Sequence, residues 1–401
     1  ESNPKIEQFW LSYIDALIKL GQFDGARQVL AQAQRELPTS GAFVGLKERL
    51  SSKFKDETNN FYPAQGELNK LSQCYQAKQY DEAERLALAM TKDFPKYPFG
   101  WKVLGAIFGH TGRSDEALNA NIKAILVHPQ DAEAYNNLGN ILLELGSLER
   151  AVLVYKHTIV LQPKLVLAHY NLGNVMRQLD RLKDAEKSLR YAIELKPDYA
   201  EAYNNLGNIL QEVGRLEEAE VSLKQAISLK FDYARAHSNL GATLKELNRL
   251  DEAEASLKQA IELNPDYHVA HYNLGNTLNG SGKHKEAVVR FKKSIQLNPT
   301  YTSAYVNLGV AQTDLGLYGK SITTFNKTLK LKPDYKDAYS NLSLALRFFK
   351  AKNFSSSLEK IYIDILNLET VIRPADIVSS IIIFLKYHRS IQDAIYLSNQ
   401  K

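Results

Sequence analysis

The stretch AEAYNNLGNILLELGSLERAVLVYKHTIVLQPKL, residues 132–165, returns closely related as AEAYNNLGNILQEVGRLEEAEVSLKQAISLKFDY, residues 200–233. Its Leu-Gly pair recurs every 34 residues, at Leu104-Gly105, Leu138-Gly139, Leu172-Gly173, Leu206-Gly207, Leu240-Gly241, Leu274-Gly275 and Leu308-Gly309. Alanine follows most of these glycines twelve positions later, at Ala117, Ala151, Ala185, Ala219, Ala253 and Ala287. Similarity at a fixed period of this length is typical of a repeat array.

Each repeat has the pattern of two helices joined by a short turn. Apolar residues from Leu138 to Leu145 follow the i, i+3, i+4, i+7 spacing that places them on one helix face. Gly146 then ends this first helix, and a second helix is expected from 151 through 161. Pro163 stops the second helix because proline lacks the backbone N–H that a continuing helix needs. One apolar face of such a hairpin stays exposed, so stacking on neighbouring repeats must bury it.

These small, aromatic and proline positions resemble the tetratricopeptide-repeat family over most of the chain. The resemblance implies an all-α fold, a right-handed superhelical solenoid of antiparallel helix pairs whose first helices line the concave groove. We expect tetratricopeptide-like helices in 1–53 and a linker at 54–63. Eight contiguous repeats are expected in 64–335, followed by a degenerate repeat and hydrophobic C-terminal helices in 336–401.

Composition argues against several classes of protein. The net charge is only +5 over 401 residues and is spread along the chain, so no nucleic-acid interface is indicated. No apolar run approaches the roughly 20 residues that cross a bilayer, so no membrane insertion is expected. The single cysteine, Cys74, excludes an intramolecular disulfide. The compartment stays open: the chain is either cytoplasmic or secreted after removal of a signal.

No motif of catalysis or cofactor binding stands out. Gly280-Ser281-Gly282-Lys283 looks like part of a phosphate loop, but Thr277 stands where that loop needs glycine, and His284 follows the lysine. His169, His237 and His271 share one repeat position that is tyrosine elsewhere, which favours packing over metal binding. We therefore predict a protein that is not an enzyme, with no catalytic residue, no cofactor and no metal site.

Asparagines form a ladder with the period of the array. They lie at Asn137, Asn171, Asn205, Asn239, Asn273, Asn307 and Asn341, with a second partial row at Asn140, Asn174, Asn208 and Asn276. Residues three apart share a helix face, and each amide offers a donor and an acceptor. Such a row can hold an extended peptide by its backbone, and it resembles the substrate-holding repeats of O-linked N-acetylglucosamine transferase. The alternative is that asparagine is simply common in consensus repeats of this family.

Both ends of the chain are rich in apolar residues. The first helix carries Phe9, Trp10 and Tyr13, and the C-terminal segment carries Ile377, Ile381, Ile382, Phe384 and Leu385. Soluble arrays usually cover their ends with polar caps. We therefore expect a self-assembly interface between unlike ends, which closes into a ring or continues as a filament. The alternative is that the last helix folds back as an unusual cap.

Three hypotheses for function follow. The favoured one is a non-catalytic scaffold for protein–protein interaction that self-assembles through its uncapped ends into a homo-oligomer or filament. The second is a monomeric scaffold that binds peptides in the asparagine-lined groove. The third is the substrate-presenting arm of a larger transferase, because similar arrays precede transferase domains in longer chains. The expected partners are other proteins, extended peptides and copies of this chain, with no nucleic acid.

Overall fold

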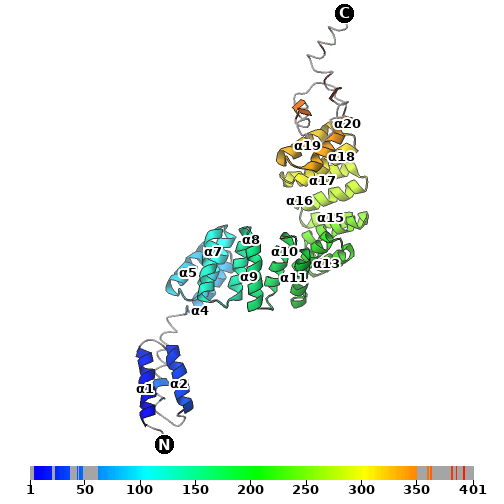
Figure 1. Ribbon diagram of the computed structural model, residues 1–401. Helices are drawn as coiled ribbons and strands as arrows, with labels where there is room; N and C mark the ends of the chain where they lie inside the picture. The colour runs from blue at the N-terminus through cyan, green and yellow to red at the C-terminus, as the bar shows by residue number, and fades with distance from the viewer. Residues whose placement is uncertain are drawn as a thin grey trace, which may run out of the picture. The chain divides into compact units, whose positions relative to one another are not determined.

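The computed structural model describes residues 4–19, 23–36, 43, 45–47 and 62–349, with residues 359, 360, 362, 363, 381, 382, 385 and 392. These residues form helices joined by turns, and none of them lies in a strand (Figure 1). The chain divides into two compact units, Glu1–Val175 and Met176–Lys401. Most of the predicted linker at 54–63 lies outside the described residues.

The first unit begins with a helix pair that has its own core. This pair is α1 (Pro4–Lys19) and α2 (Phe23–Glu36), and Ile14, Leu30 and Phe43 are buried between its helices and the segment that follows. Further pairs are α4 (Gln65–Gln76) with α5 (Tyr80–Asp93), α6 (Pro98–His110) with α7 (Ser114–Val127), and α8 (Ala132–Glu144) with α9 (Leu148–Leu161). The helix α10 (Val166–Gln178) contains the division between the units.

The second unit continues the same pattern. Its helices are α11 (Leu182–Leu195), α12 (Ala200–Glu212), α13 (Leu216–Leu229), α14 (Ala234–Glu246), α15 (Leu250–Leu263), α16 (His268–Gly280), α17 (His284–Leu297), α18 (Thr302–Asp314), α19 (Tyr318–Leu331) and α20 (Lys336–Phe348). From α12 through α18, the first helices pack on the second helix of their repeat and on first helices of neighbouring repeats, as α16 does with α14, α17 and α18. The predicted fold class, an all-α solenoid of antiparallel helix pairs, is confirmed.

Close packing within a pair depends on a glycine of the first helix. Gly139 lies against the buried Tyr155 ring, and Gly275 lies against the buried Phe291 ring. The same contact joins Gly207 to Leu223, Gly241 to Leu257 and Gly309 to Phe325. A Cβ on Gly275 would lie 2.6 Å from the Phe291 ring, well inside van der Waals contact. The glycine therefore makes room for a large side chain of the second helix.

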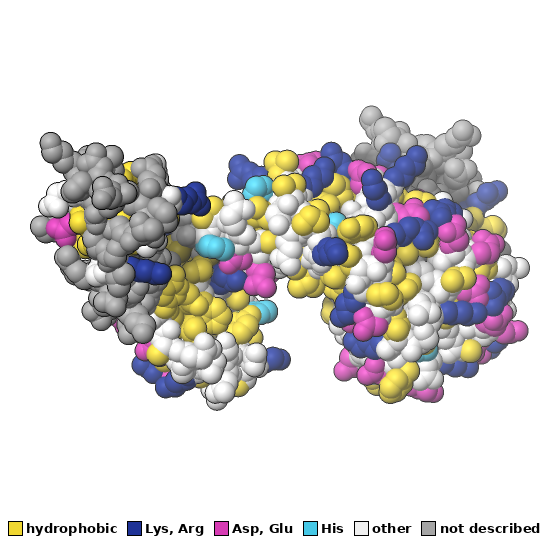
Figure 2. All heavy atoms as spheres, turned by 90° about the horizontal axis from the view of Figure 1, so that it is seen from below, with side chains coloured by type: hydrophobic (Ala, Val, Ile, Leu, Met, Phe, Trp, Pro, Cys, Tyr) yellow, Lys and Arg dark blue, Asp and Glu magenta, His cyan; other side chains and the backbone are white. Residues whose placement is uncertain are grey.

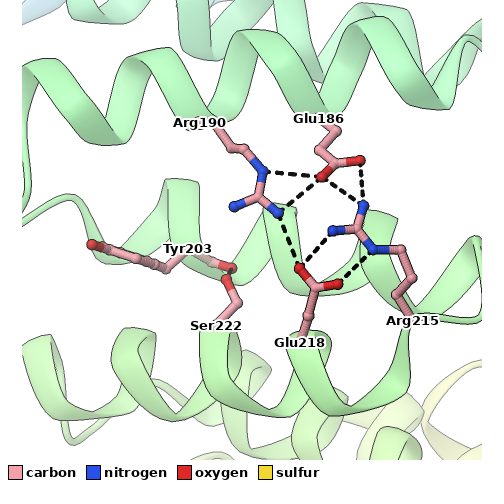
Figure 3. A network of polar contacts seen from close by, with 6 residues as sticks. All are labelled: Glu186, Arg190, Tyr203, Arg215, Glu218 and Ser222. Carbon is pink, nitrogen blue, oxygen red and sulfur yellow. Dashed lines mark hydrogen bonds and ion pairs between the residues drawn. The ribbon is translucent and has the colours of Figure 1, made fainter.

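Ion pairs join successive repeats at the start of several second helices. In the second unit, Arg215 Nη1 lies 2.8 Å from Glu186 of the preceding repeat, and Arg215 Nη2 lies 2.5 Å from Glu218 of its own (Figure 3). Arg249 makes the same two contacts with Glu220 and Glu252. We call this arrangement the clamp. Lysine and arginine side chains accordingly alternate with carboxylates over the surface of this unit, at the right in Figure 2.

The Gly275→Ala variant is expected to unfold more easily than the wild type. Its new methyl group meets the Phe291 ring, and overpacking of this kind costs about 1–3 kcal/mol. A gain of about 1 kcal/mol in helix propensity acts in the opposite direction. Urea unfolding followed by circular dichroism measures the balance.

Gly280→Ala is the matched control, because Gly280 lies on the same helix and its Cβ would meet no atom within 4 Å. This variant should be as stable as the wild type or slightly more stable. Equal unfolding midpoints for the two variants would contradict the role given to Gly275.

Candidate peptide-binding groove

All the predicted ladder asparagines lie on first helices and are half-buried. They are Asn137 and Asn140 on α8, Asn171 and Asn174 on α10, Asn205 and Asn208 on α12, Asn239 on α14, Asn273 and Asn276 on α16, Asn307 on α18 and Asn341 on α20. First helices of neighbouring repeats pack on one another within each unit. The ladder is therefore carried by consecutive helices, as a groove would require.

In the first unit, the ladder amide bonds to the repeat before it. Asn171 Nδ2 donates to Asn136 Oδ1 at 3.2 Å and to Asn140 Oδ1 at 3.0 Å. Asn140 Oδ1 also accepts a hydrogen bond from the Tyr155 hydroxyl at 2.7 Å. The hydrogen bonds therefore tie α10 to α8 and α9.

The second unit repeats this arrangement with varied acceptors. Asn307 Nδ2 donates to the Tyr272 hydroxyl at 3.1 Å and to Asn276 Oδ1 at 2.7 Å. Elsewhere Asn239 donates to Asn204 at 2.8 Å and Asn273 donates to Ser238 at 3.2 Å. Asn341 instead donates to the Asp337 carbonyl of its own helix at 2.8 Å. Most ladder amides thus hold neighbouring repeats together.

These bonds change what the ladder can offer a ligand. An amide nitrogen carries two N–H groups, and Asn171 and Asn307 each direct both at the preceding repeat. The side-chain oxygen of Asn307 accepts no hydrogen bond from the described residues. The sequence predicts both a donor and an acceptor at each asparagine of the ladder. The residues it missed are the acceptors one position earlier in the repeat, such as Tyr272 and Ser238.

A cavity of about 400 Å³ opens along this row in the second unit. It is lined by Lys245, Tyr272, Asn276, Asn279, Gly280, Phe291, Asn307 and Val310, which come from α14, α16, α17 and α18. Its aromatic side is a cluster of rings in contact, because the Tyr272 ring centroid lies 6.1 Å from that of Phe291 and 5.1 Å from that of Tyr301. The cavity combines an aromatic surface with amide groups and a single lysine, a combination suited to a peptide side chain.

A second hollow, of about 490 Å³, lies between α11, α12 and α13. Two of its charged groups are already paired: Arg190 Nη2 contacts Glu218 at 3.3 Å and also Glu186 at 2.9 Å (Figure 3). The bond from Arg215 lowers the pKa of the Glu218 carboxyl below its ordinary value. Ser222 donates to the Tyr203 carbonyl at 2.8 Å. This hollow offers few free polar groups, so the cavity beside Asn307 is the better candidate site.

The shared histidine position has a packing role. His169 Nε2 lies 2.8 Å from the Pro163 carbonyl, and His271 Nε2 lies 3.0 Å from the Pro265 carbonyl. Because a carbonyl only accepts, each Nε2 must carry the proton. The buried Nδ1 of His271 has no hydrogen-bond partner among the described residues. Burial accordingly lowers the pKa of His271, and Arg290 and Lys293 contribute in the same direction.

The predicted assembly residues occupy several environments. At the N-terminus, Trp10 packs against the core of α1 and α2, whereas Tyr13 is 46% exposed. At the C-terminus, Ile381 packs against the core around α20, while Ile382 is 52% and Leu385 41% exposed. The side chain of Phe9 and residues Ile377 and Phe384 lie outside the described part of the chain.

Two other sequence features can also be placed. Gly280-Ser281-Gly282-Lys283 joins α16 to α17, and Lys283 Nζ pairs with Glu254 at 2.9 Å instead of facing an open loop. Among the described helices, none is both long enough and apolar enough to cross a membrane. Within the same residues, no cluster of three or more histidine, cysteine or carboxylate side chains is arranged to hold a metal ion.

The helix pairs, the glycine contacts and the 34-residue period define a tetratricopeptide-repeat protein, and a model of that repeat matches residues 302–335. The chain belongs to the family of the cilia and flagella-associated protein 70 C-terminal domain, whose model matches residues 76–304, more than half of the chain. Domains built from these repeats are generally non-catalytic scaffolds that bind other proteins or peptides. No curated protein sequence matches the chain.

Two solved structures share the fold. The hetero-tetramer of Cut9 and Hcn1 from APC/C matches with a TM-score of 0.55 at 15% identity, over 70% of this chain and 55% of that one. A tetratricopeptide repeat protein from Parabacteroides merdae matches with a TM-score of 0.52 at 17% identity, over 61% of this chain and 97% of that one. At these identities the likeness shows the fold alone.

The lowered pKa of His271 predicts a pH dependence of stability. An unfolded histidine titrates near ~6.5, so below that pH the unfolded chain binds a proton that the folded chain resists. The stabilisation is complete above the unfolded pKa and is lost as the pH falls below it. Replacing His271 with tyrosine, the residue that Tyr305 provides at the equivalent position, should reduce the fall in unfolding midpoint between about pH 7 and pH 5.

The exposed His128 offers a control, because His128→Gln removes one histidine without removing a carbonyl contact of this kind. The two variants are compared by thermal unfolding at each pH. If the unfolding midpoint of His271→Tyr falls with pH as steeply as that of the wild type, the folded protein does not hold His271 in its neutral form.

Proposed function

We propose that this protein is a non-catalytic scaffold that binds an extended segment of a partner protein in its asparagine-lined groove. The observation that carries this proposal is the cavity between α14, α16 and α18, which places Asn276 and Asn307 beside the Tyr272 and Phe291 rings. Family membership supports the general role of binding proteins. The same binding mode would serve a substrate-presenting arm of a transferase, the third hypothesis.

The hydrogen-bonding pattern specifies how the groove binds. Because Asn307 commits its N–H groups to the preceding repeat, its oxygen is the group left for a ligand. An extended peptide presents a backbone N–H at every second residue along one edge. Side-chain oxygens of the ladder asparagines in successive repeats therefore suit the N–H donors of the peptide. The cavity receives one side chain of the peptide. Binding of this kind depends on the peptide backbone more than on its sequence.

The double variant Asn276→Ala/Asn307→Ala tests the groove. A pool of random peptides of about twelve residues is selected on immobilised wild-type protein, and the selected peptides are then measured by fluorescence anisotropy. Loss of the amides should weaken binding roughly tenfold, the effect of about one lost hydrogen bond of ~1.4 kcal/mol. Backbone N-methylation of a selected peptide should have the same effect, because it removes the donors.

Glu220→Gln is the matched control, because it weakens an inter-repeat contact made by Arg249 without touching the cavity. It should bind the peptides like the wild type. Unchanged binding by the double variant, or full binding by the N-methylated peptides, would show that the groove does not work through its amides.

Self-assembly through the chain ends is the second candidate function. It is supported by the exposed Tyr13 on α1 and the exposed Ile382 and Leu385 near the C-terminus. Burying these side chains in a contact between unlike ends would be favourable by the hydrophobic effect. The packing of Ile381 against the α20 core also fits the alternative, in which the C-terminal segment caps the array.

The variant Ile382→Asp distinguishes self-assembly through the chain ends from a C-terminal segment that caps the array. If the ends join, wild-type protein should form rings or filaments in electron micrographs as its concentration rises, and the aspartate should reverse this. Val221→Asp, at a 70% exposed valine on α13, serves as the control and should leave the assemblies intact. A single 45.2 kDa species at every concentration by light scattering would eliminate self-assembly.

A further inference from the structure

The outer surface of α7 and α9 differs from that of the later second helices at the repeat position of Leu126 and Val160, although the position of Leu153 also carries an exposed valine at Val221 and Val289. Four aliphatic side chains are exposed there: Ile122 at 40%, Leu126 at 68%, Leu153 at 68% and Val160 at 75%. Lys123 and Lys156 lie among them and are also exposed. Both helices pack on α8 within the first unit. We call these six residues the outer apolar-basic face.

Comparison with the other repeats shows that this surface is not a general property of the array. Leu126 and Val160 occupy one repeat position, which elsewhere carries polar residues: Lys92, Glu194, Ser228, Glu262, Gln296 and Lys330. Nothing in the stacking of repeats requires an aliphatic residue at a position that faces water. Ile122 and Leu126 are four residues apart on α7, and Leu153 and Val160 are seven apart on α9, so each pair shares one helix face. Exposed aliphatic groups gathered on a face typically mark a binding surface.

The lysines of this face lack the partners that lysines have elsewhere. Lys224 pairs with Glu220 at 2.7 Å, and Lys258 pairs with Glu254 at 2.8 Å, four residues earlier in each case. At the equivalent of these glutamates, α9 has Val152, so Lys156 has no ion pair among the described residues. Lys123 likewise has none within that part of the chain.

The clamp is also absent from the repeat of α9, whereas α7 keeps it through Arg113. Ser147 stands where Arg113, Arg215 and Arg249 stand in other repeats, and Leu118 stands where their preceding glutamates lie. From 150 through 179 the chain contains no aspartate or glutamate. The carboxylates that pair with lysines on later second helices are therefore missing from α9 around Leu153 and Val160.

We propose that the outer apolar-basic face binds an amphipathic helix of a partner protein whose apolar stripe is flanked by carboxylates. The aliphatic residues supply the area, and the unpaired lysines select acidic flanks by charge complementarity. A second copy of this chain fits less well, because a symmetric contact would bring the unpaired lysines of both copies into one interface, and the face has no carboxylate to offset them. This surface lies on second helices, apart from the groove on first helices, so a partner here leaves the groove free.

The test uses two synthetic helical peptides with the same leucine stripe, one flanked by glutamates and one by lysines. The full chain should bind the glutamate peptide and not the lysine peptide, measured by fluorescence anisotropy at about 0.1 M salt. The variant Leu126→Gln/Val160→Ser should bind it at least roughly tenfold more weakly. These replacements match Gln296 and Ser228 at the same repeat position, so the helices should fold normally.

Two further variants make the result specific. Lys156→Glu should also weaken binding, whereas Val289→Gln, at a 62% exposed valine on α17, should leave it unchanged. Equal binding of both peptides, or wild-type binding by the double variant, overturns the proposal.

Vesicles containing about one-third phosphatidylserine form the last arm of the test. If the chain binds them through Leu126 and Val160 and ignores both peptides, the face recognises an anionic membrane and a protein partner is excluded.

Discussion

At Gly275 the ring of Phe291 rests on bare helix backbone, and other repeats make the same contact with leucine or tyrosine in place of phenylalanine. The contact sets how closely the two helices of a repeat approach, and it buries the largest side chain of the second helix. The contacts between repeats depend on this spacing of the two helices. The second helix can bring its clamp residues to the next repeat, and the first helix can present its asparagines, only because the pair is held at one spacing. Where Ser343 replaces this glycine, the clear period of the array also ends.

Glycine contacts hold the two helices of one repeat together, and polar bonds hold neighbouring repeats together. The ladder asparagines join first helices, as from Asn307 to Asn276, and the clamp joins second helices, as from Arg249 to Glu220. Where both kinds of bond are present, a repeat is joined to its neighbour through both of its helices. The two proposed binding surfaces lie where these bonds are incomplete. In the groove an amide oxygen of Asn307 accepts no hydrogen bond from the described residues, and on the outer surface the repeat of α9 lacks the clamp. In a solenoid, structural and binding residues can therefore share one repeat position and differ only in their neighbours.

Much of this fold follows from the sequence alone. A period of 34 residues, with glycine and alanine at fixed places, predicts the helix pairs and their close approach because both depend on contacts inside one repeat. The direction of the asparagine amides could not be predicted in this way, since their acceptors lie on the preceding repeat and depend on the rotation between repeats. Proline also proved less important than expected. The helix α13 ends at Leu229 although Phe231 replaces the proline, and His237 bonds the Phe231 carbonyl at 3.2 Å as His169 bonds that of Pro163.

The commitment of Asn307 to the preceding repeat also has a mechanical consequence. Both of its N–H groups cross from α18 to α16, so a force that pulls these helices apart must break those bonds early. Once they are broken, the same amide turns from an acceptor alone into a donor as well. Separating the two helices would therefore change the hydrogen-bonding groups that this surface presents. The side-chain amide of Asn307 therefore contributes both to the contact between repeats and to the proposed binding surface.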